Sequence, residues 1–243
     1  MATLTIYSSD CSGSPLYGYV YNWWAAIGDT TGNDISDKNL TSSDDWEVPD
    51  YLDWQALADV VDPDWTFPVD TIGRSLKSIG LTYWNDPSDP NLEGTDDVGF
   101  DGRGAGVRNH TDGSYAQQGT VLRMWRSEES AVTSDGMLAY LQYNIVKLGV
   151  PSSATTGNSI DKNHGCSIRL VNNSTTLSDG EYGTYIGNDG KIYLTVCIGT
   201  QEWIVTNLVE TKWRDGTSID QVEWDAAGDT EWINATSAKM SIP

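Results

Sequence analysis

A helical period in the apolar positions is clearest between residues 50 and 61. The apolar side chains there are spaced i, i+3, i+4 and i+7, as on one face of a helix: Trp54, Leu57, Ala58 and Val61. Asp50 precedes them and can accept hydrogen bonds from first-turn amides, and Pro63 stops the run. The pattern predicts a helix from Asp50 to Val61.

A second, shorter helix is predicted from Ile72 to Ile79. Ile72, Leu76 and Ile79 share one face at the helical period, and Gly80 follows where a helix commonly ends. No other part of the chain predicts a helix.

The rest of the chain alternates short β-type runs with turn signals. Strands are expected at residues 17–24, 120–126, 137–147, 167–171, 191–198 and 202–208. Turns are expected at Asp112-Gly113, Asp135-Gly136, Asp179-Gly180, Asn188-Asp189-Gly190 and Asp215-Gly216. A long polar loop covers residues 85–106. Two short helices within loop-rich antiparallel β structure predict an α+β fold.

A polar, turn-forming linker at residues 172–180 divides the chain into a main body, 1–171, and a β segment, 181–243. Some sixty residues are too few to bury a stable core without a metal or disulfides. We therefore expect the segment to dock on the body or on a neighbouring subunit.

Charge narrows the range of partners. The chain has 14 Lys+Arg against 35 Asp+Glu, a formal net charge of −21. This balance argues against nucleic acid as a partner and against an anionic membrane surface. No apolar run is long enough for membrane insertion, and the first ten residues lack a secretory signal pattern. We expect the chain to act where it is made or to leave the cell inside a virus particle.

Cysteine and histidine give no catalytic pattern. Cys11, Cys166 and Cys197 are widely spaced, which favours buried free thiols, with one disulfide plus one free thiol as the alternative. His110 and His164 both lie in turn-like segments and are expected to be exposed loop residues. No nucleophile motif accompanies them, so the sequence predicts no enzyme.

Six blocks of the chain, in order, resemble those of one known family. They are YGYVYNWWAA (17–26), WEVP with DW and Leu57 (46–57), LK to WN (76–85), GF to Arg108 (99–108), WRS (125–127) and GCSIR (165–169). This order is similar to the Fibrobacter succinogenes major paralogous domain, whose fold resembles that of C-type lectins. The blocks imply a rigid frame made of Tyr21, Asn22, Trp23, Trp46, Pro49, Trp54, Arg108, Trp125 and Arg169.

Residues 193–217 resemble the same family again, but they match the block that usually opens the domain. Either the domain is circularly permuted, which we favour, or the tail begins a second, truncated copy. Permutation is feasible when chain termini lie close together. It would place the strand at 191–198 beside the strand at 167–171, with Cys166 and Cys197 on neighbouring strands, in possible disulfide reach.

The resemblance implies a binding or structural module. We expect a non-enzymatic virion protein of a phage (head fibre, decoration or tail component) with structural or host-binding function. Its expected partners are other virion proteins or identical subunits, and a host surface glycan or protein. The alternative is a bacterial cell-surface carbohydrate-binding module, and a carbohydrate-active enzyme is third.

Aromatic and cationic residues in the second half of the body are the candidate ligand-binding face, because aromatic rings stack on sugars and anchor interfaces. They are Tyr115, Arg123, Arg126, Tyr140, Tyr143 and Asn144. No cofactor is expected, and we favour a solvated acidic loop at residues 85–106 over a metal site. The alternative is a Ca²⁺ site, because carboxylates of that loop could ligate the ion: Asp86, Asp89, Asp96 and Asp97, with Glu93. Trp224 and Trp232 in the tail are expected to meet a partner.

Overall fold

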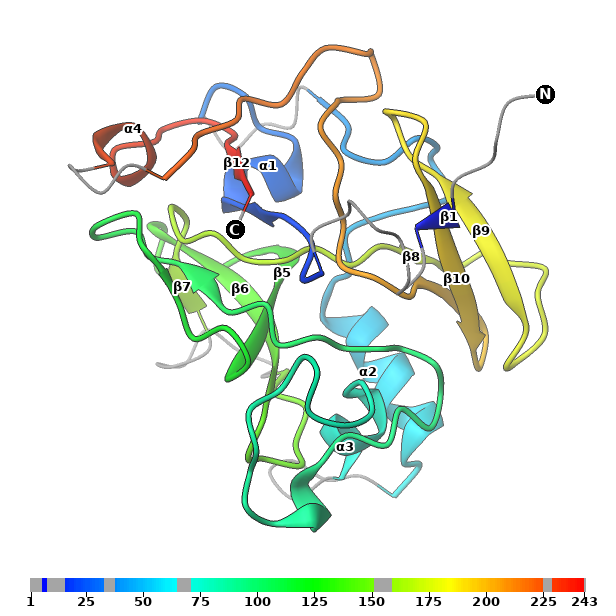
Figure 1. Cartoon of the computed structure of the whole chain (residues 1–243). Helices are drawn as coiled ribbons and strands as arrows, with labels where there is room; N and C mark the ends of the chain where they lie inside the picture. The colour runs from blue at the N-terminus through cyan, green and yellow to red at the C-terminus, as the bar shows by residue number, and fades with distance from the viewer. Residues whose placement is uncertain are drawn as a thin grey trace.

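The computed structural model describes residues 6–7, 16–32, 38–64, 71–150, 159–224 and 229–242. Its helices and strands form an α+β arrangement of short elements joined by long loops (Figure 1). One sheet lies at one side of the molecule, a second sheet lies opposite, and helices α2 (Tyr51–Val61) and α3 (Ile72–Leu76) lie together below them (Figure 1). None of the described helices is long and apolar enough to cross a membrane.

The largest sheet combines strands from both ends of the chain. Its strands are β1 (Ile6–Tyr7), β8 (Val171–Asn172), β9 (Tyr182–Ile186), β10 (Ile192–Ile198) and β11 (Gln201–Ile204). β10 pairs antiparallel with β9 and β11 and parallel with β1, and β11 pairs antiparallel with β8. The strand predicted at 191–198 is confirmed, whereas the one predicted at 202–208 ends at Ile204. The strand at 191–198 is not adjacent to residues 167–171, because β11 lies between them.

The second sheet is an antiparallel set of β5 (Val121–Glu129), β6 (Asp135–Gln142) and β7 (Ser159–Asp161). Two small pairs complete the described strands: β3 (Val107–Arg108) with β4 (Tyr115–Ala116), and β2 (Val20–Tyr21) with β12 (Met240–Ser241). The turn predicted at Asp135-Gly136 is wrong: both residues belong to β6 and pair with β7.

Helix α2 (Tyr51–Val61) confirms the clearest sequence prediction. Asp50 is its N-cap and accepts hydrogen bonds from the amides of Leu52 and Asp53, while Asp53 in turn accepts one from the amide of Asp50. This reciprocal capping box satisfies donors that a helix start otherwise leaves unpaired.

The remaining helices differ from the sequence predictions. α3 is Ile72–Leu76, shorter than predicted, because Lys77 turns into an extended conformation and forms a bridge with Gly102. Ile79 is therefore 71% exposed instead of buried. α1 (Trp23–Ile27) occupies part of a predicted strand, and α4 (Thr230–Ile233) was not predicted. A 3-10 turn, η1, covers Pro90–Leu92 in the polar loop.

Helix α1 forms because Asn22 caps it. The Asn22 side chain accepts a hydrogen bond from the amide of Ala25, and Gly28 ends the helix with φ of 79°. A local side-chain cap of this kind overrides the β-type aromatic composition of the segment.

Two apolar cores each contain residues from the body and from the tail. The first joins Tyr21 and Trp125 to Tyr193 and Ile204. In the second, the rings of Trp54 and Trp203 lie 4.8 Å apart, both fully buried. The described residues of the tail, 181–224 and 229–242, therefore pack against the body of the same chain.

The two tryptophans of the tail differ in burial, and the two described cysteines are free thiols. Trp232 is fully buried, contrary to expectation, whereas Trp224 is 50% exposed. Cys166 and Cys197 are both buried free thiols, so no disulfide joins them. Cys11 lies outside the described residues.

Candidate functional site

The family-like blocks place a set of large polar and aromatic side chains in the interior. All nine residues expected to form a frame are buried: Tyr21, Asn22, Trp23, Trp46, Pro49, Trp54, Arg108, Trp125 and Arg169. The two arginines matter most for the shape of the surface, because each one holds several loops by their carbonyl oxygens.

Arg169 is a fully buried cation that joins the polar loop to the tail. Its guanidinium donates to the carbonyl oxygens of Phe100 and Asp101 on one side. On the other side it donates to the carbonyls of Ile204 and Val205 and to the side chain of Asn207. Burial lowers the pKa of Arg169 to about 9, and these acceptors offset the cost of removing the charge from water.

Arg108 has the same role at the C-terminal end of the chain. It donates to the carbonyls of Gly113 and Val222 at 2.9 and 2.6 Å and forms an ion pair with Asp229. Its guanidinium lies 4.1 Å from the ring centroid of Trp232. The burial of Trp232 therefore follows from a cation–π contact with a frame residue.

Two of the predicted ligand-binding residues are engaged inside the molecule. The Tyr115 hydroxyl lies 2.5 Å from Ser241 Oγ and donates to the carbonyl of Ile242. These contacts hold β12 against the body. Arg126 is 2% exposed and forms an ion pair with Glu128. Arg126 is therefore buried and engaged within the chain, and its role in ligand binding stays a prediction.

Of the other four residues of that face, Arg123 and Tyr140 lie on β5 and β6, and Tyr143 and Asn144 follow the end of β6. Arg123 is half-buried opposite Tyr140 in the β5–β6 register, and its side chain makes no hydrogen bond or ion pair with any described residue. The ring of Tyr140 covers Gly149. Tyr143 packs partly against the second core, and Asn144 is exposed.

The acidic loop uses its carboxylates locally. Asp86 and Asp89 accept hydrogen bonds from backbone amides two residues later. Asp96 accepts from the amide of Asp101, and burial raises its pKa to about 6. Asp97 accepts from Ser75 and Thr95, which lowers its pKa. In the described ranges no three His, Cys, Asp or Glu side chains are grouped closely enough to hold a metal ion.

Asp97 also lines a hollow of about 480 Å³ together with Arg74, Asn91 and Thr95. Its Oδ2 already accepts two hydroxyl hydrogen bonds there, each 2.7 Å long. Arg74 donates to the carbonyl of Glu93. Asp97 and Arg74 in this hollow are therefore already engaged within the chain.

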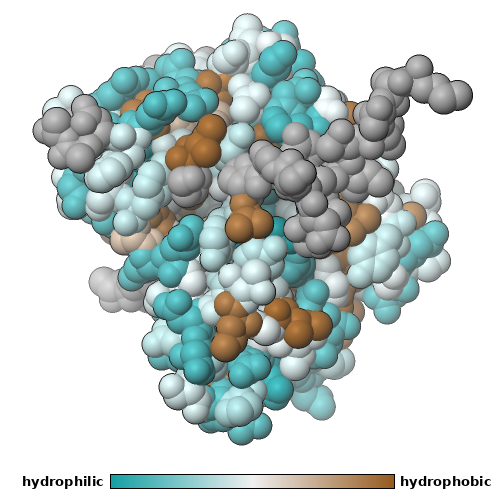
Figure 2. All heavy atoms as spheres, in the orientation of Figure 1, coloured by the Kyte–Doolittle hydropathy of each residue, from teal (hydrophilic) through white to brown (hydrophobic). Residues whose placement is uncertain are grey.

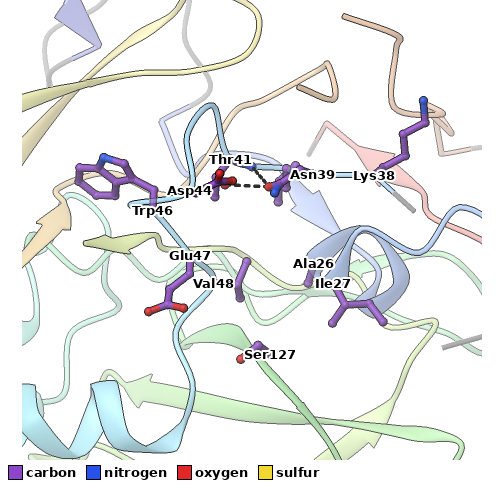
Figure 3. A pocket seen from close by; sticks show the side chains of 11 residues that line it. Ala26, Ile27, Lys38, Asn39, Thr41, Asp44, Trp46, Glu47, Val48 and Ser127 are labelled. Atoms are coloured by element: carbon purple, nitrogen blue, oxygen red, sulfur yellow. Dashed lines mark hydrogen bonds between the residues drawn. The ribbon is translucent and has the colours of Figure 1, made fainter. Parts of the chain in front are cut away.

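A second hollow, which we call the loop pocket, lies between α1, residues 38–48 and β5 (Figure 3). Its volume is about 320 Å³. Polar groups make up one part of its wall: Lys38, Asn39, Thr41, Asp44, Glu47 and Ser127. Apolar groups make up the other: Ala26, Ile27, Leu40, Trp46 and Val48. Figure 3 shows Asn39, Thr41 and Asp44 together on one side and Ser127 across from them.

Residues of the tail hold the loop that forms this pocket. Arg214 donates to the carbonyl of Thr41 at 2.8 Å and forms an ion pair with Asp44. Asn188 donates to the carbonyl of Leu40 at 2.7 Å. Tyr185 accepts from the amide of Ser42 at 2.8 Å, and its ring lies 4.8 Å from that of Trp46. The polar wall is thus fixed by segments far away in the sequence.

Two of the three charged side chains of the loop pocket have an oppositely charged partner within the chain, and the third has a neutral one. Asp44 pairs with Arg214, and Glu47 accepts a hydrogen bond from Asn173. Lys38 pairs with Asp215 and holds the pKa of that carboxyl well below its usual range. A wall of paired charges, amides and hydroxyls suits a neutral ligand that can both donate and accept hydrogen bonds.

Beyond Lys38 a smaller hollow of about 200 Å³ begins, lined also by Thr30, Trp213, Thr217 and Asp220. Sequence reasoning did not identify either hollow. The loop at residues 38–45 has no helical or alternating pattern, and the residues that hold it belong to the tail. The only available signal was the family-like block that begins at Trp46.

The face of the molecule in Figure 2 is mostly hydrophilic, with apolar side chains in small separate groups. Comparison with curated proteins and with solved structures found no match for the chain. A family comparison did find one: residues 2–172 match the Fibrobacter succinogenes major domain. This match covers most of the chain and includes all six blocks quoted above, so the chain belongs to the Fibrobacter succinogenes major domain family.

Proposed function

We propose that this chain is a non-enzymatic binding protein that serves as a structural or host-binding component of a phage virion. In this proposal it carries a circularly permuted C-type lectin-like domain. The domain contacts a glycan or a protein of the host surface, and it also contacts other virion proteins or identical subunits.

The observation that carries the proposal is the loop pocket. Its volume of about 320 Å³ falls within the range of small-ligand sites. Its polar groups other than Ser127 come from one loop, and tail residues fix that loop by hydrogen bonds at three consecutive residues, Leu40, Thr41 and Ser42. A fixed loop loses little conformational freedom when a ligand binds.

The chemistry of the wall favours a saccharide unit. Sugar hydroxyls donate to carboxylates and accept from amides and hydroxyls, and all three groups are present in Asp44, Asn39 and Ser127. The adjoining hollow shares Lys38, so a second unit of the same glycan would have a place beside the first.

A non-catalytic role is supported by what lines the pocket. None of its eleven lining residues is a histidine or a cysteine. Its two carboxylates already have internal partners in Arg214 and Asn173. A glycosidase instead needs one protonated carboxyl and one free carboxylate on either side of the scissile bond.

Strand pairing supports the permuted domain. The tail resembles the block that usually opens the family's domain, and its strand β11 pairs with β8 at the end of the body. A truncated second copy would be expected to begin a separate core, whereas the tail contributes to both apolar cores of the body.

Glycan arrays probed with the purified chain test the proposal. We expect retention of a defined glycan class without release of free sugar, and presence of the chain in purified phage particles. Released sugar would contradict the non-enzymatic role. Retention together with attachment to bacterial envelopes, and absence from particles, would favour the alternative of a bacterial cell-surface carbohydrate-binding module.

A further inference from the structure

The fold brings the only two histidines of the chain together. Nδ1 of His110 lies 3.2 Å from Nε2 of His164, and the two ring centroids are 4.3 Å apart. We propose that this pair is a binding site for a divalent transition metal of the Zn²⁺, Cu²⁺ or Ni²⁺ class, with His110 Nδ1 and His164 Nε2 as its protein ligands.

The distance between the two nitrogens fits a shared metal ion. Imidazole nitrogens bind Zn²⁺ at about 2.0–2.1 Å, so two of them on one ion stand about 2.9–3.3 Å apart at angles from square to tetrahedral. The observed 3.2 Å lies inside this interval. An ion could therefore replace the hydrogen bond between the rings with only a small rotation of the side chains.

The surroundings of His164 select the tautomer that can bind a metal. Its Nδ1 lies 3.3 Å from the carbonyl oxygen of Asp161, which also accepts the backbone amide of His164. A proton held on Nδ1 by this carbonyl leaves the lone pair of Nε2 directed at His110. Metal-binding histidines are commonly oriented by a second hydrogen bond of this kind.

The backbone fixes both histidines. Arg108 and Gly165 exchange two backbone hydrogen bonds of 2.9 and 2.8 Å, which sets the hairpin of His110 against the turn of His164. Asn109 and Ser114 close that hairpin. Two adjacent, supported ligands lose little freedom on binding a metal, so the site is preorganised.

Protonation and charge also bear on the pair. Metal binding requires neutral imidazole. Arg123 opposes a bound cation, and no third His, Cys, Asp or Glu of the described ranges joins the pair. Water would complete the coordination, and two nitrogen ligands favour transition metals over Ca²⁺ or Mg²⁺.

The test is a titration of tag-free protein with ZnCl₂, followed by calorimetry and by NMR of the two imidazole rings. We expect one Zn²⁺ per chain, selective shifts of both ring spin systems, and a higher melting temperature with Zn²⁺ but not with Ca²⁺. His110→Asn should weaken Zn²⁺ binding by at least about tenfold, while Asp112→Asn in the same hairpin should leave it unchanged.

His110→Asn suffices as the deciding variant if His164→Asn does not fold. Absence of Zn²⁺ binding by the wild-type chain would overturn the proposal, as would equal binding by His110→Asn. A lower melting temperature of metal-free His110→Asn, with no effect of Zn²⁺ on the wild type, would mean that the two rings only hydrogen-bond to each other.

Discussion

At the scale of single residues, this protein uses buried cations in place of regular strand pairing. The ammonium of Lys77, 1% exposed, shares its three N–H donors among the carbonyls of Leu92, Gln142, Tyr143 and Ile145. Arg108 and Arg169 act in the same way. Carbonyl groups in long loops lack partners in a sheet, and a buried cation satisfies several of them at once.

Trp54 is the residue whose loss should cost most in the second core. None of its surface is accessible to solvent, and its ring packs against those of Phe100 and Trp203. We expect Trp54→Ala to lower the free energy of unfolding by about 3–5 kcal/mol. Leu52→Ala on the same helix is the control, because Leu52 is 65% exposed. Equal losses in urea denaturation would contradict this packing.

Glu210 should give the protein a measurable pH dependence. Burial raises the pKa of this carboxyl from 4.5 to about 7. Tyr193 donates to it, the amide of Asp189 donates to its other oxygen, Lys191 lies nearby, and the Tyr21 hydroxyl bonds to its backbone carbonyl. The folded state therefore binds the proton more tightly than the unfolded state does.

The contribution of Glu210 to stability is accordingly complete below pH 4.5 and is lost as the pH rises to 7, by up to about 3 kcal/mol. We expect Glu210→Gln to be more stable than the wild type at pH 8, with the difference disappearing by pH 4. Thermal melts across this range measure it, and parallel pH profiles of the two proteins would refute the assignment.

At the scale of elements, the cap of α2 is open to direct measurement. Asp50→Ala removes the acceptor for two amides and should cost about 1 kcal/mol. Asp45→Ala, an exposed acid just before the helix, is the matched control and should change stability by less than about 0.5 kcal/mol. A cap variant as stable as the control would show that packing alone holds the helix.

The elements that could be predicted from sequence are those with local causes. α2 has an N-cap, an apolar stripe and a stop, and β10 has a run of β-type residues. α3 ends early because the Lys77 ammonium binds carbonyls of loops distant in sequence. α1 depends on the single Asn22 cap within an aromatic run. Neither a long-range hydrogen bond nor a single cap residue produces a periodic pattern in the sequence.

The candidate sites differ in the same way in how far the sequence predicts them. Arg108 and Arg169 were predicted as frame residues from the family-like blocks, and both are buried. The loop pocket could not be predicted, because Arg214 and Tyr185 of the tail determine its shape. The meeting of His110 with His164 likewise depends on backbone hydrogen bonds between Arg108 and Gly165.

At the scale of the whole molecule, the body and the tail share their cores and the largest sheet. We therefore expect one cooperative unfolding transition, with coincident fluorescence and circular dichroism curves. A chain ending at residue 180 should lack a stable fold, because Trp203 and Tyr193 leave both cores. Two separate transitions, or a folded truncated chain, would contradict this unity.

A pocket-filling substitution tests whether the loop pocket binds the ligand. Ser127 is exposed on the pocket wall, so Ser127→Trp should fill the pocket without unfolding the chain, and Ser127→Ala should leave it open. For the glycan or host surface that retains the wild type, we predict a loss of no more than about tenfold for Ser127→Ala, which removes one hydroxyl, and a loss of at least about thirtyfold for Ser127→Trp at an unchanged melting temperature. Equal affinity of all three proteins would show that the ligand does not bind in the loop pocket.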